Sequence, residues 1–95
     1  MFVEVVQVIP EDNYDLILYF CDGRVKKYNI RHLIDKGVFT ALRDISFYKD
    51  RCTVLNHTVA WDLSGEYDPS LCIDLDPAVL YADGIDIKDP LEKTA

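Results

Sequence analysis

The sequence predicts an α+β domain: a mainly antiparallel sheet of about five strands that carries two or three short helices on one face. The expected order of elements is β-β-β-α-β-β-α. Three observations support this class. Short runs rich in β-branched and aromatic residues are separated by turn residues, two of these turns have hairpin chemistry, and a well-marked helix start follows near the C-terminal end.

The first expected strand covers residues 2–9 (FVEVVQVI) and ends before Pro10, which has no N–H for a sheet ladder. Its alternation breaks at Val5-Val6. The strand is therefore either buried on both faces, as in a central position, or it carries a β-bulge.

A hairpin is expected next. Residues 14–20 (YDLILYF) form its first strand, and alternate side chains share one face: Tyr14, Leu16, Leu18 and Phe20. Cys21-Asp22-Gly23 makes the turn, and residues 24–28 return along the first strand. The loop has either two or three residues, and the sequence leaves both lengths open. The two lengths place the side chains of residues 24–28 on opposite faces of the sheet.

Short helical turns follow the hairpin. Asn29 is expected to cap a helical turn over residues 30–35, which Gly37 closes. Residues 38–42 (VFTAL) form a second helical turn, and residues 44–50 are expected to be a connection.

A second hairpin is predicted in the following part of the chain. Its strands cover residues 52–55 and 58–63, around a turn at Asn56-His57, where Asn tolerates the left-handed conformation. Residues 64–69 form a loop.

Asp76-Pro77 marks a helix start, with Asp as the N-cap and Pro at the first helical position. The helix covers residues 78–82 and ends at Gly84. We expect a single domain over residues 1–84 and a tail over residues 85–95 that could add an edge strand.

The composition is that of a soluble globular protein, with 49% hydrophobic and 28% charged residues. No targeting segment is expected, and no apolar run approaches the roughly 20 residues of a membrane span. The three cysteines, Cys21, Cys52 and Cys72, have no C-x-x-C spacing, so we expect free thiols in the cytoplasm.

Charge is unevenly distributed along the chain, whose net charge is −7. Residues 1–23 and 62–95 are acidic, whereas residues 24–51 are basic. The overall sign predicts no direct nucleic-acid binding. A solvated surface that keeps the protein soluble is the favoured explanation of the charge, and an acidic face that steers a basic protein partner stays open as the alternative. A homodimer is also expected to be feasible, through contact of the basic and acidic parts or through edge strands at residues 24–28 or 85–87.

Several short motifs occur together in a fixed order. They are Phe20-x-Asp22-Gly23, Tyr28-Asn29-Ile30, Gly37-Val38-Phe39-x-x-Leu42, Phe47, Val59-x-Trp61 and Asp74-Leu75-Asp76-Pro77-x-x-Leu80-Tyr81. With these motifs the chain resembles, over residues 2–82, the bacterial family called domain of unknown function 2442. Many members have Asp in place of Asn29 and a shorter connection than residues 62–73.

The resemblance implies a small α+β fold and no agreed activity or catalytic residue. It also implies two kinds of context: some members carry an attached helix-turn-helix domain, and some are encoded beside small basic proteins that look like toxin–antitoxin partners.

The carboxylates of residues 62–76 are the first candidates for a metal site or an acid–base pair: Asp62, Glu66, Asp68, Asp74 and Asp76. The spacing of a calcium-binding loop is absent. A structural role is favoured, because Asp76 is explained as a helix cap and Asp68-Pro69 as a turn.

His32 and His57 are the two histidines, and no Cys or Ser nucleophile is placed beside either by the sequence. The four glycines are isolated, so no phosphate-binding loop is present. We therefore expect no enzyme activity, no cofactor and no bound metal.

Trp61 lies in an alternating strand, which favours packing in the core over exposure as an anchor for a partner. What remains is an acidic surface that borders the longest loop, which is a better candidate for a docking face than for an active site. The candidate partner-binding residues are Trp61, Asp62, Glu66, Tyr67, Asp68 and Asp74.

The favoured function is a non-enzymatic protein-interaction or regulatory module, similar to the antitoxin half of a pair. Two alternatives stay open. One is a metal-dependent enzyme that uses the acidic loop at residues 62–76, and the other is an accessory domain of a DNA-binding regulator.

Overall fold

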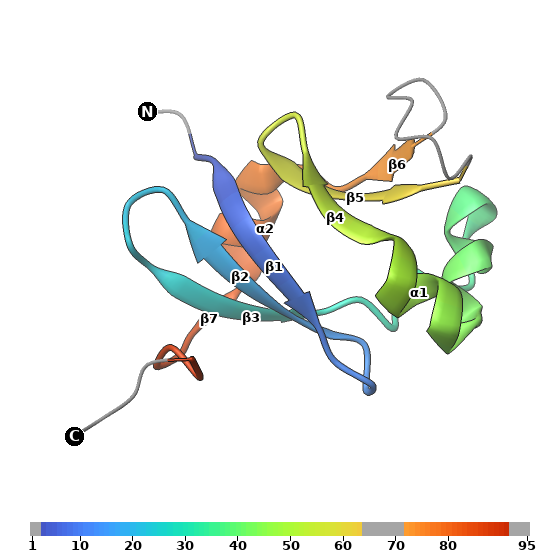
Figure 1. Ribbon diagram of the computed structural model, residues 1–95, viewed down its shortest axis with the longest axis horizontal. Coiled ribbons are helices and arrows are strands. Elements are labelled where there is room, and N and C mark those ends of the chain that lie inside the picture. Colours follow the sequence, from blue (N-terminus) through green and yellow to red (C-terminus); the bar gives the residue numbers. More distant parts are fainter. Residues whose placement is uncertain (1–2, 64–71, 92–95) are drawn as a thin grey trace.

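The computed structural model describes residues 3–63 and 72–91. Figure 1 shows two small sheets with three short helices at their margins. The elements in chain order are β1 (Val5–Pro10), β2 (Asp15–Phe20), β3 (Val25–Asn29), η1 (Gly37–Arg43, a 3₁₀-helix), α1 (Ile45–Arg51), β4 (Cys52–Leu55), β5 (Thr58–Asp62), β6 (Cys72–Asp74), α2 (Pro77–Asp83) and β7 (Ile85–Asp86).

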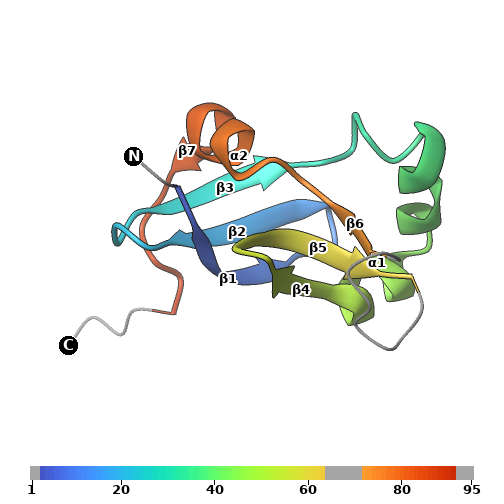
Figure 2. The same ribbon diagram turned by 90° about the horizontal axis from the view of Figure 1, so that it is seen from above.

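The strands form two antiparallel sheets, with the orders β1-β2-β3-β7 and β4-β5-β6. Figure 2 shows β1, β2 and β3 side by side, with β4 and β5 next to β1. The predicted α+β class is confirmed, although the strands are divided between two sheets. The division depends on which distant strands pair, and local sequence patterns do not record this.

β1 carries a β-bulge between Val5 and Gln7, as one of the two open interpretations predicted. The other interpretation is wrong, because β1 is an outer strand and Val6 is 57% exposed. The bulge turns Val5 into the core while the next two residues stay exposed.

The β2–β3 hairpin has a loop of three residues. Phe20 N donates to Arg24 O at 3.0 Å, and Gly23 N donates to Phe20 O at 3.0 Å. Gly23 has a φ of 90°, which a residue with a side chain rarely adopts. This register places Leu16, Leu18 and Phe20 in the core, so the predicted shared face is confirmed.

Two helical predictions need correction. Residues 31–35 form turns and not a helix, although Asn29 Oδ1 accepts from Arg31 N at 2.9 Å. Residues 44–50 are not a simple connection, because Asp44 caps α1 by accepting from the N–H groups of Ser46 and Phe47. The second predicted helical turn is present as η1.

The predicted hairpin around Asn56-His57 is confirmed, with φ values of 52° and 67° at the two turn residues. This left-handed pair matches the twist of the strands β4 and β5. The strand β6, which the sequence did not predict, pairs with β5. The predicted loop at residues 64–69 lies outside the described residues.

The second predicted helix start is confirmed: Asp76 accepts from Ala78 N, and Pro77 is the first residue of α2. Gly84 ends α2 where a side chain has no room, because a Cβ would lie 2.6 Å from Leu80 O. The chain then adds β7 to the edge of β3, as expected for the tail.

β7 also brings the acidic and basic parts of the chain together. The buried Lys26 places its Nζ 3.0 Å from Asp86 Oδ1 and 4.8 Å from the centre of the Tyr81 ring. Because β7 covers β3 at Lys26 and Lys27, this part of β3 is not a free edge for a dimer.

The core lies between the two sheets and is centred on Trp61 and Tyr48, which are both fully buried. Their rings stack with centroids 6.2 Å apart, and Trp61 Nε1 donates to Tyr48 O at 2.9 Å. Tyr48 in turn donates its hydroxyl to Asp15 O at 3.0 Å, which fixes α1 on β2. The preference for Trp61 as a core residue is confirmed.

Candidate functional site

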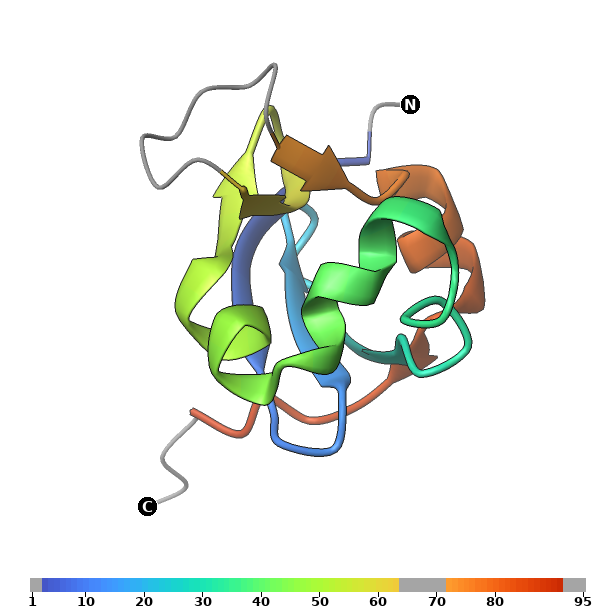
Figure 3. The ribbon, with the colours of Figure 1, turned by 90° about the vertical axis from the view of Figure 1, so that its right-hand side faces the viewer.

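An apolar groove of about 250 Å³ lies between β3, the segment that joins β6 to α2, and the turns around η1. Figure 3 shows η1, β6 and α2 on the same side of the molecule. The residues that line the groove are Tyr28, Leu33, Phe39, Asp74, Leu75, Asp76, Val79 and Leu80. They come from segments far apart in the sequence.

The wall formed by Leu75 is held by β5. Leu75 N donates to Val59 O at 3.1 Å, and Leu75 O accepts from the buried hydroxyl of Thr58 at 2.5 Å. Asp76 then begins α2, which adds Val79 and Leu80 to the same wall. The backbone of this wall is therefore fixed on both sides of Leu75.

The opposite wall is made of Leu33 and Phe39, which are half-buried and pack against the core. Successive turns hold their backbone: Leu33 N donates to Ile30 O, Lys36 N to Leu33 O, and Phe39 N to Lys36 O. These turns replace the predicted helix at residues 30–35 and place Leu33 and Phe39 on one side.

Tyr28 closes the end of the groove next to β3. Its hydroxyl lies 3.2 Å from Nε2 of the exposed His32. Burial, followed by the negative charge of Asp83, raises the pKa of Tyr28 above its ordinary value. The phenol is therefore neutral at physiological pH, and it presents an apolar ring to the groove.

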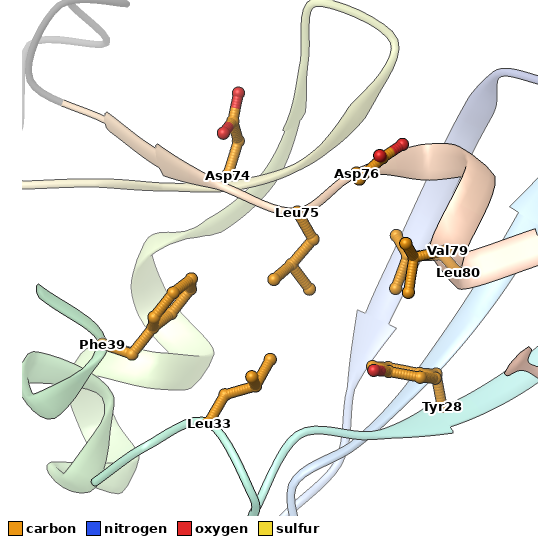
Figure 4. A pocket seen from close by; sticks show the side chains of 8 residues that line it. All are labelled: Tyr28, Leu33, Phe39, Asp74, Leu75, Asp76, Val79 and Leu80. Atoms are coloured by element: carbon orange, nitrogen blue, oxygen red, sulfur yellow. The ribbon is translucent and has the colours of Figure 1, made fainter. Parts of the chain in front are cut away.

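The groove has an acidic rim. Figure 4 shows Leu33, Phe39 and Leu75 pointing towards one another, whereas the carboxylates of Asp74 and Asp76 point away from this apolar centre. Both aspartates are exposed, and no basic residue is among those that line the groove. An apolar hollow with a negative border results.

The structure buries some of the predicted docking residues and exposes another. Trp61 and Asp62 have 0% and 1% exposure, so they cannot form a docking face. Asp74 is exposed at the rim of the groove. Glu66, Tyr67 and Asp68 lie outside the described residues.

The buried polar groups near these positions have structural contacts. Arg51 donates to the carbonyl of Asp62 at 3.3 Å, and Cys72 Sγ lies 3.9 Å from Asp62 Oδ1. All five residues of β5 are buried, so both of its faces are covered. Because both faces of β5 are covered, the alternation of apolar and polar residues in its sequence does not mark an exposed face.

The histidines and cysteines form no catalytic set in residues 3–63 and 72–91. His57 Nδ1 lies 3.6 Å from Glu4 Oε2 on the surface, and His32 contacts Tyr28. Burial raises the pKa of Cys52 to about 12, which keeps its thiol protonated and unreactive. Within the described part of the chain, no group of three His, Cys, Asp or Glu side chains could hold a metal ion.

Sequence reasoning missed the apolar part of the site: Tyr28, Leu33, Phe39, Leu75 and Val79. A weak signal was present in Val79, an apolar residue next to Leu80 in a short helix that can bury only one side. The other lining residues look like core residues in the sequence, and only their arrangement makes them a groove.

These features define the class of the protein: a small α+β domain with two antiparallel sheets, three short helices in its described part, and an apolar groove with an acidic rim. The chain belongs to the family described as protein of unknown function (DUF2442), which it matches over residues 5–86. The resemblance predicted from the motifs is thereby confirmed.

The comparisons with curated proteins and with solved structures gave no significant match. No helix in the described ranges is long and apolar enough to cross a membrane.

Proposed function

We propose that this chain is a non-enzymatic interaction module of the cytoplasm that binds a basic partner protein in the groove. The single observation that carries the proposal is the apolar groove with the acidic rim of Asp74 and Asp76. The partner inserts one or two apolar side chains and places lysine or arginine next to the rim.

The size of the groove supports a protein partner over a small molecule. Sites for small molecules commonly measure about 300–1,000 Å³, whereas this groove measures about 250 Å³. It can hold one or two aliphatic side chains and little else. Val79, which is 43% exposed, and the ring of Phe39 would be covered by such an insertion.

The charge of the rim supports a basic partner. Within residues 3–63 and 72–91, neither Asp74 nor Asp76 forms an ion pair with a basic side chain, and Asp83 adds a further negative charge near Tyr28. Together with the net charge of −7, these groups attract a basic surface and increase its rate of association. A small basic protein that is held inactive by binding would make this chain the regulatory half of a pair.

The test is a selection of random peptides displayed on phage against the intact chain and two matched variants. Val79→Lys places a positive charge in the groove, and Val6→Lys places the same change on β1, away from the lining. Both valines are exposed, so neither change disturbs the core. We expect basic peptides that bind the wild type and Val6→Lys, and bind Val79→Lys at least about tenfold more weakly.

Peptides that bind Val79→Lys as well as they bind the wild type would overturn the proposal. So would a selection that yields only acidic peptides, because these contradict the charge argument.

A further inference from the structure

β6 is the outer strand of its sheet in the part of the chain that the structure describes. It pairs with β5 on one side, in the register Ala60↔Asp74, Trp61↔Ile73 and Asp62↔Cys72. An outer strand can accept a further strand when its backbone groups are available.

The ladder shows which backbone groups face outwards. Leu75 N donates to Val59 O, and residues of an antiparallel pair alternate between hydrogen-bonded and non-hydrogen-bonded positions. Leu75 is therefore at a hydrogen-bonded position, and Asp74 is not. The N–H and C=O of Asp74 point away from β5, towards the outer side of β6.

The side chains alternate in the same way. Asp74 and Leu75 are neighbours in an extended segment, so they point to opposite faces. Figure 4 shows Leu75 in the groove and the carboxylate of Asp74 outside it. An added strand would repeat this alternation: its residue beside Leu75 enters the groove, and its residue beside Asp74 faces the carboxylate.

We infer that the partner binds as an extended strand that pairs with the outer edge of β6 at Asp74. This inference rests on the proposed function and specifies its binding mode. The segment that binds has alternating apolar and basic residues: a leucine, isoleucine or valine enters the groove, and lysine or arginine neighbours pair with Asp74. A helical segment would instead present its apolar residues with a spacing of three and four.

Two short capped peptides of the same composition test the spacing. One alternates lysine and leucine, and the other places its leucines next to each other. We expect the alternating peptide to bind at least about fivefold more tightly, because only its leucines share a face. The binding is measured by NMR titration of the isotope-labelled chain, with signals of Phe39, Leu75 and Val79 shifting.

Two substitutions of Asp74 test the backbone contact. Asp74→Ala removes the carboxylate and keeps the outward N–H, whereas Asp74→Pro removes both. Proline is tolerated at an edge position whose N–H does not face the neighbouring strand. We expect Asp74→Pro to bind the alternating peptide about three- to tenfold more weakly than Asp74→Ala, as for one lost hydrogen bond.

A measurement on the wild type covers the case in which Asp74→Pro does not fold. Binding of the alternating peptide should slow hydrogen exchange of the Asp74 amide at least about tenfold, whereas amides of β1 keep their rates.

The outcomes separate the two proposals. Equal affinities of the two peptides, or an unchanged exchange rate at Asp74 in the complex, would overturn the strand mode. If displayed peptides still lose affinity for Val79→Lys in that case, the groove stands as a docking site and only its binding mode is wrong. If no peptide depends on Val79, both proposals fail.

Discussion

The two sides on which the sheets approach each other are built differently. On the closed side, β1 lies beside β4 and β5, and Val5 N donates to His57 O at 2.9 Å. On the open side, β3 and β6 belong to different sheets and do not pair with each other, and residues on both sides of the connection into α2 line the groove. The groove occupies this open side.

Polar groups are used differently on the two sides. Next to the closed side, Trp61, Tyr48 and Asp15 form a chain of hydrogen bonds that satisfies the indole and the phenol in the core. On the open side, the polar groups lie at the rim and the apolar ones line the hollow. The comparison teaches that one side of the small core is closed by satisfied polar groups, whereas the other keeps an apolar hollow, which is the side of the docking that we propose.

Truncation of an aromatic residue on each side gives the largest expected effect. Trp61→Ala should lower the free energy of unfolding by about 3–5 kcal/mol, because it leaves a cavity and removes a buried hydrogen bond. Phe39→Ala should cost less than half as much, since Phe39 is only half-buried and already borders a hollow. Urea unfolding followed by circular dichroism measures both.

Trp61→Phe keeps the experiment informative if the alanine variant does not fold. It retains a ring and loses the hydrogen bond to Tyr48 O, so a loss of about 1–3 kcal/mol is expected. Equal losses for Trp61→Ala and Phe39→Ala would break the comparison, because the two sides would then contribute equally to stability.

Removal of one hydroxyl on each side should give a smaller effect. Tyr48→Phe should cost about 1 kcal/mol, as for a buried hydrogen bond whose acceptor keeps another donor. That acceptor, Asp15 O, also accepts from Glu11 N at 2.8 Å. Tyr28→Phe should change stability by less than about 0.5 kcal/mol, because its partner His32 is exposed.

The same unfolding measurement compares these two variants. A Tyr28→Phe loss as large as the Tyr48→Phe loss would break the comparison, because the hydroxyl on the open side would then stabilise the fold as much as the buried one.

The sequence was sufficient where local chemistry decides the structure. Gly23, Asn56-His57 and Asp76-Pro77 each specify a backbone conformation or a cap within a few residues, and the turns and helix that they predict are present. The fold class follows from these elements together with the strand patterns.

The sequence was insufficient where distant parts of the chain decide. β6 has three residues and is a strand because β5 pairs with it. α1 had a visible cap in Asp44, but its residues Phe47 and Tyr48 favour strands as much as helices. Tertiary packing of Tyr48 settles the choice.

The candidate site shows the same limit. Asp74 was identified because it is acidic and near a loop, and it does lie at the rim. Trp61 and Asp62 were included because they directly precede the same loop in the sequence. The structure shows that β5, which contains them, is buried on both faces. The apolar lining comes from separate segments, so it needed the folded chain.

The smallest expected effect concerns how α2, a wall of the groove, is fastened to the β2–β3 hairpin. Tyr81 donates its hydroxyl to Asp22 Oδ2 at 2.5 Å. This hydrogen bond, with help from the N–H of Arg24, lowers the pKa of Asp22 below its ordinary value of 3.8, and the same bond raises the pKa of Tyr81 above 10.0. Both shifts favour an ionised Asp22 that faces a neutral phenol.

The direction of the pH dependence follows from these two shifts. A lowered carboxyl pKa adds stability above pH 3.8 that is lost as the pH falls through the shifted value, and a raised phenol pKa adds stability below pH 10.0 that is lost as the pH rises. The stability difference between the wild type and Tyr81→Phe should therefore be largest between these limits and shrink outside them. Both groups are near the surface, so the difference should be small and should decrease with salt. Urea unfolding of both chains at acidic, neutral and alkaline pH tests this. A difference that does not vary with pH would mean that this bond does not fasten the wall of the groove.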